Sequence, residues 1–271
     1  MAMRVGIQMD PLEDVKIDGD TSFALAEVAQ ARGAELFVYG PDHMSFEQGR
    51  VTAWARPAKV QRVKGAPGVF GETVQLDLAK DLDVILMRQD PPFDMSYITA
   101  CHLLELISGE TLVVNDPEGV RSSPEKIFPL LYPEIMPPTL VSRDVRDIVA
   151  FRATHKDIII KPLYGHGGAG VFRLKPDDSN MDSLLEVFFT RSREPVMVQA
   201  FLPAVSEGDK RIMLVDGEPQ RCGPQDLRDY RPGTEAARAC PDRNRRDRRP
   251  SHGSECHLSD GCPGHQGPVR H

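Results

Sequence analysis

The stretch from Asp157 to Leu174 constrains the fold more than any other part of the chain. Ile158–Ile160 is a short β-branched run, which suits a buried strand and is too short for a helix. Four glycines then fall within Gly165–Gly170, and Val171–Leu174 has the composition of a second strand. The stretch therefore predicts two strands joined by a flexible loop. We call Gly165–Gly170 the glycine flap.

The glycine flap has the composition of a phosphate-binding loop, because glycines let backbone N–H groups approach a ligand closely. Its Gly-x-Gly-x-x-Gly spacing also occurs in dinucleotide-binding folds, but those require a helix directly afterwards, and a strand is predicted here. The sequence contains neither a P-loop nor the protein-kinase motifs. With Lys161 at the end of the first strand, the pattern favours a cover over nucleotide phosphates. A hairpin tip without a ligand is the alternative.

Composition excludes several partner classes. The net charge is −7, and the first 220 residues carry −10 because residues 221–271 carry +3. An acidic body offers no basic surface for nucleic acid. No apolar run approaches the roughly 18 residues of a membrane span, and the N-terminus reads as a strand rather than a signal peptide. We therefore expect no nucleic-acid or membrane partner and a cytoplasmic location.

The order of predicted elements indicates an α/β fold. A strand at Arg4–Met9, a helix at Thr21–Arg32 and a strand at Glu35–Tyr39 form a β-α-β unit, which implies parallel strands. Residues 41–80 show little periodicity and are expected mostly as connection. The later predictions are strands at Asp83–Met87, Leu112–Val114, Val196–Gln199 and Arg211–Val215, and helices at Met95–Ser108, Asp144–Thr154 and Met181–Arg191.

Two further segments could bind anions. The strand ending at Met87 runs into a proline-rich turn, where open α/β sheets place ligands, and Arg88 could pair with a carboxylate or phosphate. A rigid turn with a surface ion pair is the alternative. Ser122 and Glu125 have capping-box spacing and predict a helix start. Lys126 in that first turn is either a surface lysine or directed at an anion bound by the helix N-terminus.

The last 51 residues differ from the rest. Residues 221–271 contain no Ile, Phe, Met or Trp, so they cannot offset the entropy of ordering, and we expect them to be disordered. The strand that should return after the Asp216-Gly217 turn is not recognisable, which indicates a shifted reading frame or a spliced-on sequence. A zinc module is the alternative, although the spacings match no familiar finger. Its ligands would come from Cys222, Cys240, Cys256, Cys262, His252, His257, His265 and His271.

Taken together, these motifs resemble bacterial glutathione synthetases, which are ATP-grasp ligases. The resemblance covers about residues 3–219 and rests on segments spread along that range. They are Met3–Pro11, Asp81–Asp94, Val114-Asn115, Glu125-Lys126, Ile160–Leu163, Gly167–Ala169, Gly208–Arg211 and Val215–Pro219. It implies an N-terminal substrate-binding domain with a parallel sheet at 1–122, a truncated ATP-grasp α+β domain at 123–220, and an unmatched tail at 221–271.

The resemblance also implies a reaction and its residues. ATP would phosphorylate the cysteinyl carboxylate of γ-glutamylcysteine, and the amine of glycine would then displace phosphate to give glutathione. The phosphates of ATP would contact Lys126, Lys161, Gly165, Gly167, Gly168 and Ala169, and its adenine edge Gln199, Ala200, Phe201 and Leu202. Asp209 would lie near the nucleotide and Arg211 would be catalytic, stabilising the transferred phosphoryl group. Arg88, Asp90, Pro91 and Phe93 would form the dipeptide side.

The family's cofactors are ATP and Mg²⁺ or Mn²⁺, but the resemblance fails at the metal. In the family, an Asp, a Glu and an Asn on a late strand pair hold magnesium, and nothing in residues 220–271 matches them. No metal ligand is therefore predicted, and we expect this chain to be nearly inactive. The alternatives are a dead fragment that binds nucleotide or dipeptide, and another ATP-grasp carboxylate–amine ligase. Because the family is usually tetrameric, a homo-oligomer is implied.

Overall fold

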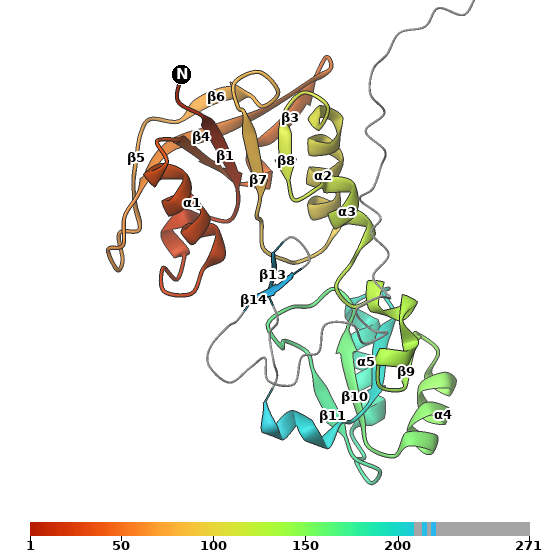
Figure 1. Ribbon diagram of the computed structural model, residues 1–271. Helices are drawn as coiled ribbons and strands as arrows, with labels where there is room; N and C mark the ends of the chain where they lie inside the picture. The colour runs from red at the N-terminus through yellow and green to blue at the C-terminus, as the bar shows by residue number, and fades with distance from the viewer. Residues whose placement is uncertain (209–212, 216–217, 221–271) are drawn as a thin grey trace, which may run out of the picture. The chain divides into compact units, whose positions relative to one another are not determined.

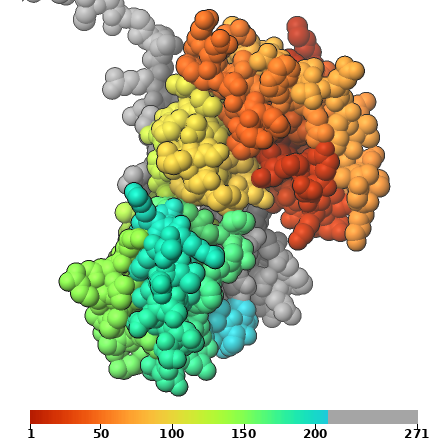
Figure 2. Space-filling view, turned by 180° about the vertical axis from the view of Figure 1, so that it is seen from behind, coloured from red at the N-terminus to blue at the C-terminus, as the bar shows by residue number. Residues whose placement is uncertain are grey.

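The computed structural model describes residues 1–208, 213–215 and 218–220 (Figure 1). The unit Met1–Arg211 contains two separate sheets, and a second unit begins at Ile212. The residues of each sheet gather together on the surface, red to yellow for the first and green to cyan for the second (Figure 2). None of the helices in the described ranges is long and apolar enough to cross a bilayer.

The first sheet grows from the predicted β-α-β unit. Strands β1 (Arg4–Gln8) and β2 (Glu35–Tyr39) are parallel, and α1 (Thr21–Ala31) connects them. Strands β7 (Val84–Met87) and β8 (Leu112–Val114) continue the sheet in the same direction. Both faces are covered by buried apolar side chains, as expected for parallel strands. The parallel N-terminal arrangement is confirmed for these four strands.

Helices α2 (Met95–Ile107) and α3 (Pro117–Ser122) follow β7 and β8. Each begins at an aspartate, because its carboxylate accepts a hydrogen bond from an N–H of the first turn. Asp94 accepts from the N–H of Tyr97 at 2.9 Å, and Asp116 accepts from the N–H of Gly119 at 3.2 Å. Cys101 and Leu104, on one face of α2, are fully buried against the sheet.

Residues 41–80 correct a prediction, since they form four antiparallel strands rather than a connection. They are β3 (Met44–Glu47), β4 (Arg50–Val60), β5 (Gly68–Phe70) and β6 (Val74–Asp77). Because β4 also pairs antiparallel with β2, the sheet is mixed, in the order β3-β4-β2-β1-β7-β8. The buried positions of β4 do alternate, at Val51, Ala53 and Ala55. Alanines are weak strand formers, so the alternation was missed.

The second sheet is antiparallel throughout, in the order β11-β10-β12-β9. Its strands are β9 (Thr139–Ser142), β10 (Ile158–Pro162), β11 (Phe172–Leu174) and β12 (Val196–Ala200). Helices α4 (Val145–His155) and α5 (Met181–Arg191) contribute to its core. Ile158 and Ile160 of β10 are fully buried there. Because side chains alternate along a strand, Ile159 and Lys161 project from the opposite face.

The predicted helix start at Ser122 is wrong. Helix α3 ends at Ser122, residues 125–127 form a turn, and a 3-10 helix follows at Phe128–Leu131. The helix begins earlier, at Asp116 and Pro117, because this pair supplies both a cap and a favoured first residue. Lys126 therefore lies in the turn between α3 and this 3-10 helix, and not in the first turn of an α-helix. The other 3-10 helices are Leu12–Asp14, Pro41–His43, Pro133–Ile135 and Pro203–Glu207.

The missing return strand is also a wrong prediction. Strand β13 (Met213–Val215) pairs antiparallel with β14 (Glu218–Gln220), and Leu214 lies opposite Pro219. Proline is tolerated in such a ribbon where its nitrogen faces outward, away from the partner strand. The Asp216-Gly217 turn, the predicted site residues Asp209 and Arg211, and the tail at 221–271 lie outside the described residues.

Candidate nucleotide site

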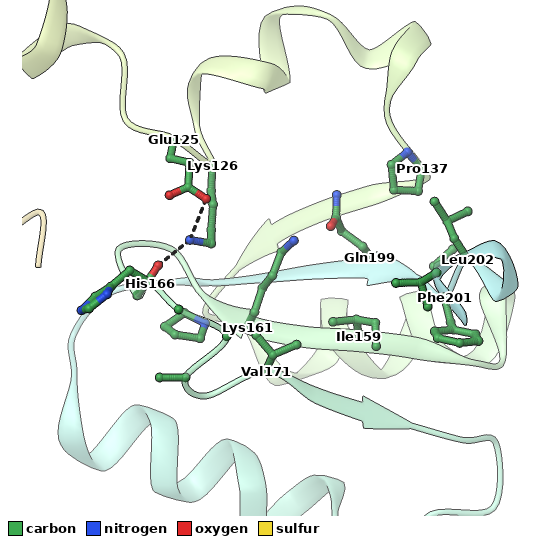
Figure 3. Close-up of a pocket in the computed structure, with 17 residues that line it drawn as sticks. Glu125, Lys126, Pro137, Ile159, Lys161, His166, Val171, Gln199, Phe201 and Leu202 are labelled. Carbon is green, nitrogen blue, oxygen red and sulfur yellow. Dashed lines mark hydrogen bonds and ion pairs between the residues drawn. The ribbon is translucent and has the colours of Figure 1, made fainter. Parts of the chain in front are cut away.

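A cavity of about 400 Å³ lies on the face of the second sheet that carries Ile159 and Lys161 (Figure 3). We call it the sheet cavity. Ten predicted nucleotide-binding residues line it: Lys126, Lys161, Gly165, Gly167, Gly168, Ala169, Gln199, Ala200, Phe201 and Leu202. These are all the predicted nucleotide residues that the structure describes. A larger cavity of about 560 Å³ follows the ends of β1 and β2 and contains none of the predicted site residues.

Two lysines reach the sheet cavity from different elements. Lys126 comes from the turn after α3, and its ammonium donates to the carbonyl oxygen of Gly165 at 2.5 Å and lies 3.6 Å from Glu125. Lys161 comes from β10 and points into the cavity (Figure 3), where its ammonium has no hydrogen bond or ion pair with another described residue. Burial lowers the pKa of Lys161, and the nearby charge of Lys126 lowers it further. Two converging cations suit an anionic ligand.

The glycine flap closes one side of the sheet cavity. Gly167 and Gly168 have φ angles of +59° and +77°, which side chains with a Cβ rarely adopt. A Cβ on Gly165 would lie 2.8 Å from Cγ of Pro162, so a larger residue there would displace the proline ring or the flap. The N–H groups of Gly167 and Gly168 donate to no residue within the described ranges. They therefore remain available to phosphate oxygens.

The connector after β12 forms the other end of the cavity. The N–H of Ala200 donates to the carbonyl of Pro138 at 3.0 Å, and the N–H of Phe201 donates to the carbonyl of Asp157 at 2.9 Å. These two bonds fix the path of the backbone. The next N–H, of Leu202, has no acceptor among the residues that the structure describes. A free donor beside apolar side chains suits the edge of a planar base.

The ring of Phe201 contacts a charged pair that does not line the sheet cavity and that the sequence did not single out. The guanidinium of Arg173 lies 3.5 Å from the centre of the Phe201 ring. Two hydrogen bonds, of 3.0 and 2.6 Å, join Arg173 to the carboxylate of Asp157, and this contact lowers the pKa of Asp157. The three residues are far apart in sequence, so no local pattern identifies them.

A second cavity, of about 260 Å³, adjoins the first and shares Glu125, Lys126 and Gly165 with it. We call it the aromatic cavity. Pro91 and Phe93 of the predicted dipeptide turn line it.

Two tyrosines complete the wall of the aromatic cavity. The ring centres of Tyr97 and Tyr164 lie 5.1 and 5.9 Å from that of Phe93. Burial raises the pKa of Tyr97, which keeps its hydroxyl neutral. Sequence reasoning missed both tyrosines, because only the fold brings them to Phe93.

Arg88 and Asp90 line neither of these two cavities. The guanidinium of Arg88 donates to the hydroxyl of Ser22 at 3.0 Å, and the backbone N–H of Asp90 donates to the carboxylate of Asp10 at 2.6 Å. Both contacts tie the turn to α1 and to the end of β1. In the structure, these residues hold the turn that presents Phe93.

The described residues do not by themselves form a magnesium site. Glu125 is the only described acid that lines the sheet cavity, and it lies beside Lys126. No group of three His, Cys, Asp or Glu side chains suited to a metal occurs in the described part of the chain. Magnesium needs a nearly octahedral set of oxygens, so this donor set does not fit it.

Known protein families and curated relatives match most of this chain. The profile "Prokaryotic glutathione synthetase, N-terminal domain" matches residues 3–121, and the ATP-grasp domain profile of the same family matches residues 125–225. Glutathione synthetases of Brucella melitensis and Mesorhizobium japonicum are 54% and 52% identical to the chain over 219 residues, covering 81% of this chain and 70% of each relative.

Among solved structures, the D-cycloserine synthetase DcsG aligns with a TM-score of 0.51 at 16% identity, over 80% of this chain and 65% of that one. A likeness at this identity concerns the fold alone. The two profiles and the curated relatives carry the assignment: the chain belongs to the prokaryotic glutathione synthetase family, whose members are ATP-grasp carboxylate–amine ligases.

Proposed function

We propose that this chain binds ATP in the sheet cavity and γ-glutamylcysteine in the aromatic cavity, as the substrates of glutathione synthesis. The observation that carries the proposal is the gathering of ten predicted nucleotide residues around one cavity. Strand alternation supports it, because it places Lys161 on the face opposite the core. A cytoplasmic location fits these substrates.

The phosphates of ATP would lie between the two lysines and the glycine flap. Phosphoryl transfer depends mainly on positioning and on neutralising charge. The ammonium groups of Lys126 and Lys161 supply charge, and the N–H groups of Gly167 and Gly168 supply donors. The adenine would lie against the connector, with its edge at the N–H of Leu202.

The two cavities share a junction where the reaction would take place. A dipeptide in the aromatic cavity would bring its cysteinyl carboxylate to Lys126, beside the terminal phosphate of ATP. A carboxylate oxygen attacks the γ-phosphorus, the bond to ADP breaks, and an acyl phosphate forms. The amine of glycine then attacks the acyl carbon, the amide forms, phosphate leaves, and the amine loses a proton. The thiol would contact aromatic rings, which sulfur favours.

Three predicted components are not part of this geometry. We infer that Asp209 lies near the nucleotide and that Arg211 stabilises the transferred phosphoryl group, as the resemblance implies; both lie outside the described residues. Bound magnesium would neutralise charge on the β and γ phosphates. Because the described donor set does not fit it, no step above passes through the metal.

Calorimetry tests the binding proposal. The full chain is titrated with ATP and with γ-glutamylcysteine, with and without magnesium. We expect saturable binding of both ligands, weakened for ATP by Lys161→Met and unchanged by Lys59→Met, a matched exposed lysine on β4. Absence of saturable ATP binding, or equal loss in both variants, would contradict the proposal.

A second candidate is a chain that binds its ligands without joining them. The single acid in the sheet cavity favours it, because the described residues leave the metal without ligands. Incubation of the purified chain with γ-glutamylcysteine, glycine, ATP and magnesium separates the two candidates. Glutathione in the product mixture supports the ligase, and binding without product supports the second candidate.

A further inference from the structure

Lys126 makes a contact that nucleotide binding does not require. Its ammonium donates to the carbonyl oxygen of Gly165 at 2.5 Å, a bond between two residues of the protein itself (Figure 3). The Lys126 side chain is only 13% exposed, so this charge-assisted bond is shielded from water. Lys161, in the same cavity, has no such bond to the flap or to another described residue. The two lysines are therefore not equivalent.

The glycine flap has few other attachments. Its backbone bonds are local, from the N–H of Ala169 to the carbonyl of His166 at 3.1 Å and from the N–H of Val171 to the carbonyl of Gly168 at 3.4 Å. Among hydrogen bonds between described residues, the bond from Lys126 is the one that joins Gly165–Gly170 to a distant segment.

We propose that Lys126 is a positioning residue that tethers the glycine flap at the junction of the two cavities before nucleotide arrives. The tether acts in the protein without nucleotide, and it rests on the proposed function only in that the flap covers phosphates. Gly165 is the flap residue that lines both cavities, so the tether fixes the wall between nucleotide and dipeptide.

The chemistry of an ammonium lets the tether persist when phosphate binds. A lysine has three N–H donors. One donates to Gly165, and the ion pair with Glu125, at 3.6 Å, is weak because Glu125 is 77% exposed. A phosphate oxygen can therefore take a free donor without displacing the flap. One side chain then couples occupation of the sheet cavity to order in the flap.

Hydrogen exchange on the full chain, without nucleotide, tests the tether. The peptide covering residues 163–172 is followed in the parent, Lys126→Met, Lys126→Arg and Lys161→Met. Lys126→Met is expected to accelerate exchange of the bonded N–H groups of Ala169 and Val171 on the order of tenfold, the loss of one charge-assisted bond. Lys161→Met removes the same charge from the same cavity and is expected to leave this exchange unchanged.

Each outcome decides the proposal. Lys126→Arg retains a donor and should restore most of the protection, whereas unfolding would accelerate exchange in β1 and β2 as well. Equal exchange in the parent and Lys126→Met overturns the tether, and so does equal acceleration in Lys126→Met and Lys161→Met. Because no nucleotide is present, this experiment can fail while the proposed function stands, and the calorimetry above can fail while the tether stands.

Discussion

Replacing Lys161 by methionine should weaken nucleotide binding without lowering the stability of the protein in the absence of nucleotide. Methionine keeps an unbranched stem on β10 and removes only the charge. The pKa of Lys161 is lowered first by burial and then by the charge of Lys126, so the folded protein disfavours the ammonium. That charge has no hydrogen bond or ion pair with another described residue. Its removal therefore relieves an unfavourable term in the absence of ligand.

The size of the binding loss follows from one contact. A hydrogen bond to a charged group contributes about 1.5–3 kcal/mol, so losing the bond from Lys161 to a phosphate should weaken ATP affinity roughly 10- to 150-fold. The melting temperature of the unliganded variant should equal or exceed that of the parent.

The pH dependence of stability provides a second, independent test of the unpaired charge on Lys161. With the pKa of Lys161 below its unfolded value of 10.5, the unfolded chain binds this proton more tightly than the folded one. The charge on Lys161 therefore lowers the free energy of unfolding by its full amount at pH values below the folded pKa. As the pH rises from there towards 10.5, this loss disappears and the protein becomes more stable. The variant lacks this gain.

Calorimetry with ATP and thermal melts of the unliganded chain, at neutral and alkaline pH, measure both effects. Lys59→Met, on the exposed side of β4, controls for the loss of a positive charge. The reasoning is refuted if Lys161→Met leaves ATP affinity unchanged. It is also refuted if affinity and melting temperature fall together, because Lys161 would then support the fold.

Three further substitutions test the flap, the core and a helix cap. Gly170→Ala places a side chain at φ +72° and 3.2 Å from Pro162, so it should cost about 1–2 kcal/mol locally and accelerate hydrogen exchange in the flap; unchanged exchange contradicts this. Ile160→Ala empties a fully buried position and should lower the free energy of unfolding by about 2–5 kcal/mol in urea titrations. Asp144 caps the N-terminus of α4, and hydrogen bonds from the side chain and backbone of Arg146 lower its pKa from 3.8 to about 2. Its contribution to stability is thus present above 3.8 and lost as pH falls through about 2, and acid melts of Asp144→Asn should lack this loss.

The sequence could predict those parts of the site that depend on local alternation. Three isoleucines followed by a lysine place alternate side chains in the core and in the cavity once the stretch is a strand. The sequence could also predict a flexible loop at the flap, because Gly167 and Gly168 adopt positive φ angles that glycine permits. In both cases the information lies within a few consecutive residues.

The parts that sequence reasoning missed depend on contacts between distant segments. Tyr97 and Tyr164 reach the aromatic cavity from α2 and from the residue before the flap, and Arg173 reaches Phe201 from β11. Their spacing in the sequence carries no signal of these contacts. The helix start near Ser122 failed for another reason, because an earlier Asp-Pro pair competed for the same role.

The different environments of the two lysines suggest how the cavity can keep an ordered flap and still bind an anion strongly. Lys126 has acceptors within the protein itself, at Gly165 and Glu125, so its charge contributes to the local structure without a ligand. Lys161 lacks an acceptor among the described residues, so part of its cost is recovered only when an anion enters. If both lysines were paired, phosphate would have to break two contacts; if neither were, two adjacent half-buried charges would repel each other without compensation. One paired and one unpaired cation therefore hold the flap in place and still leave a strong driving force for binding ATP.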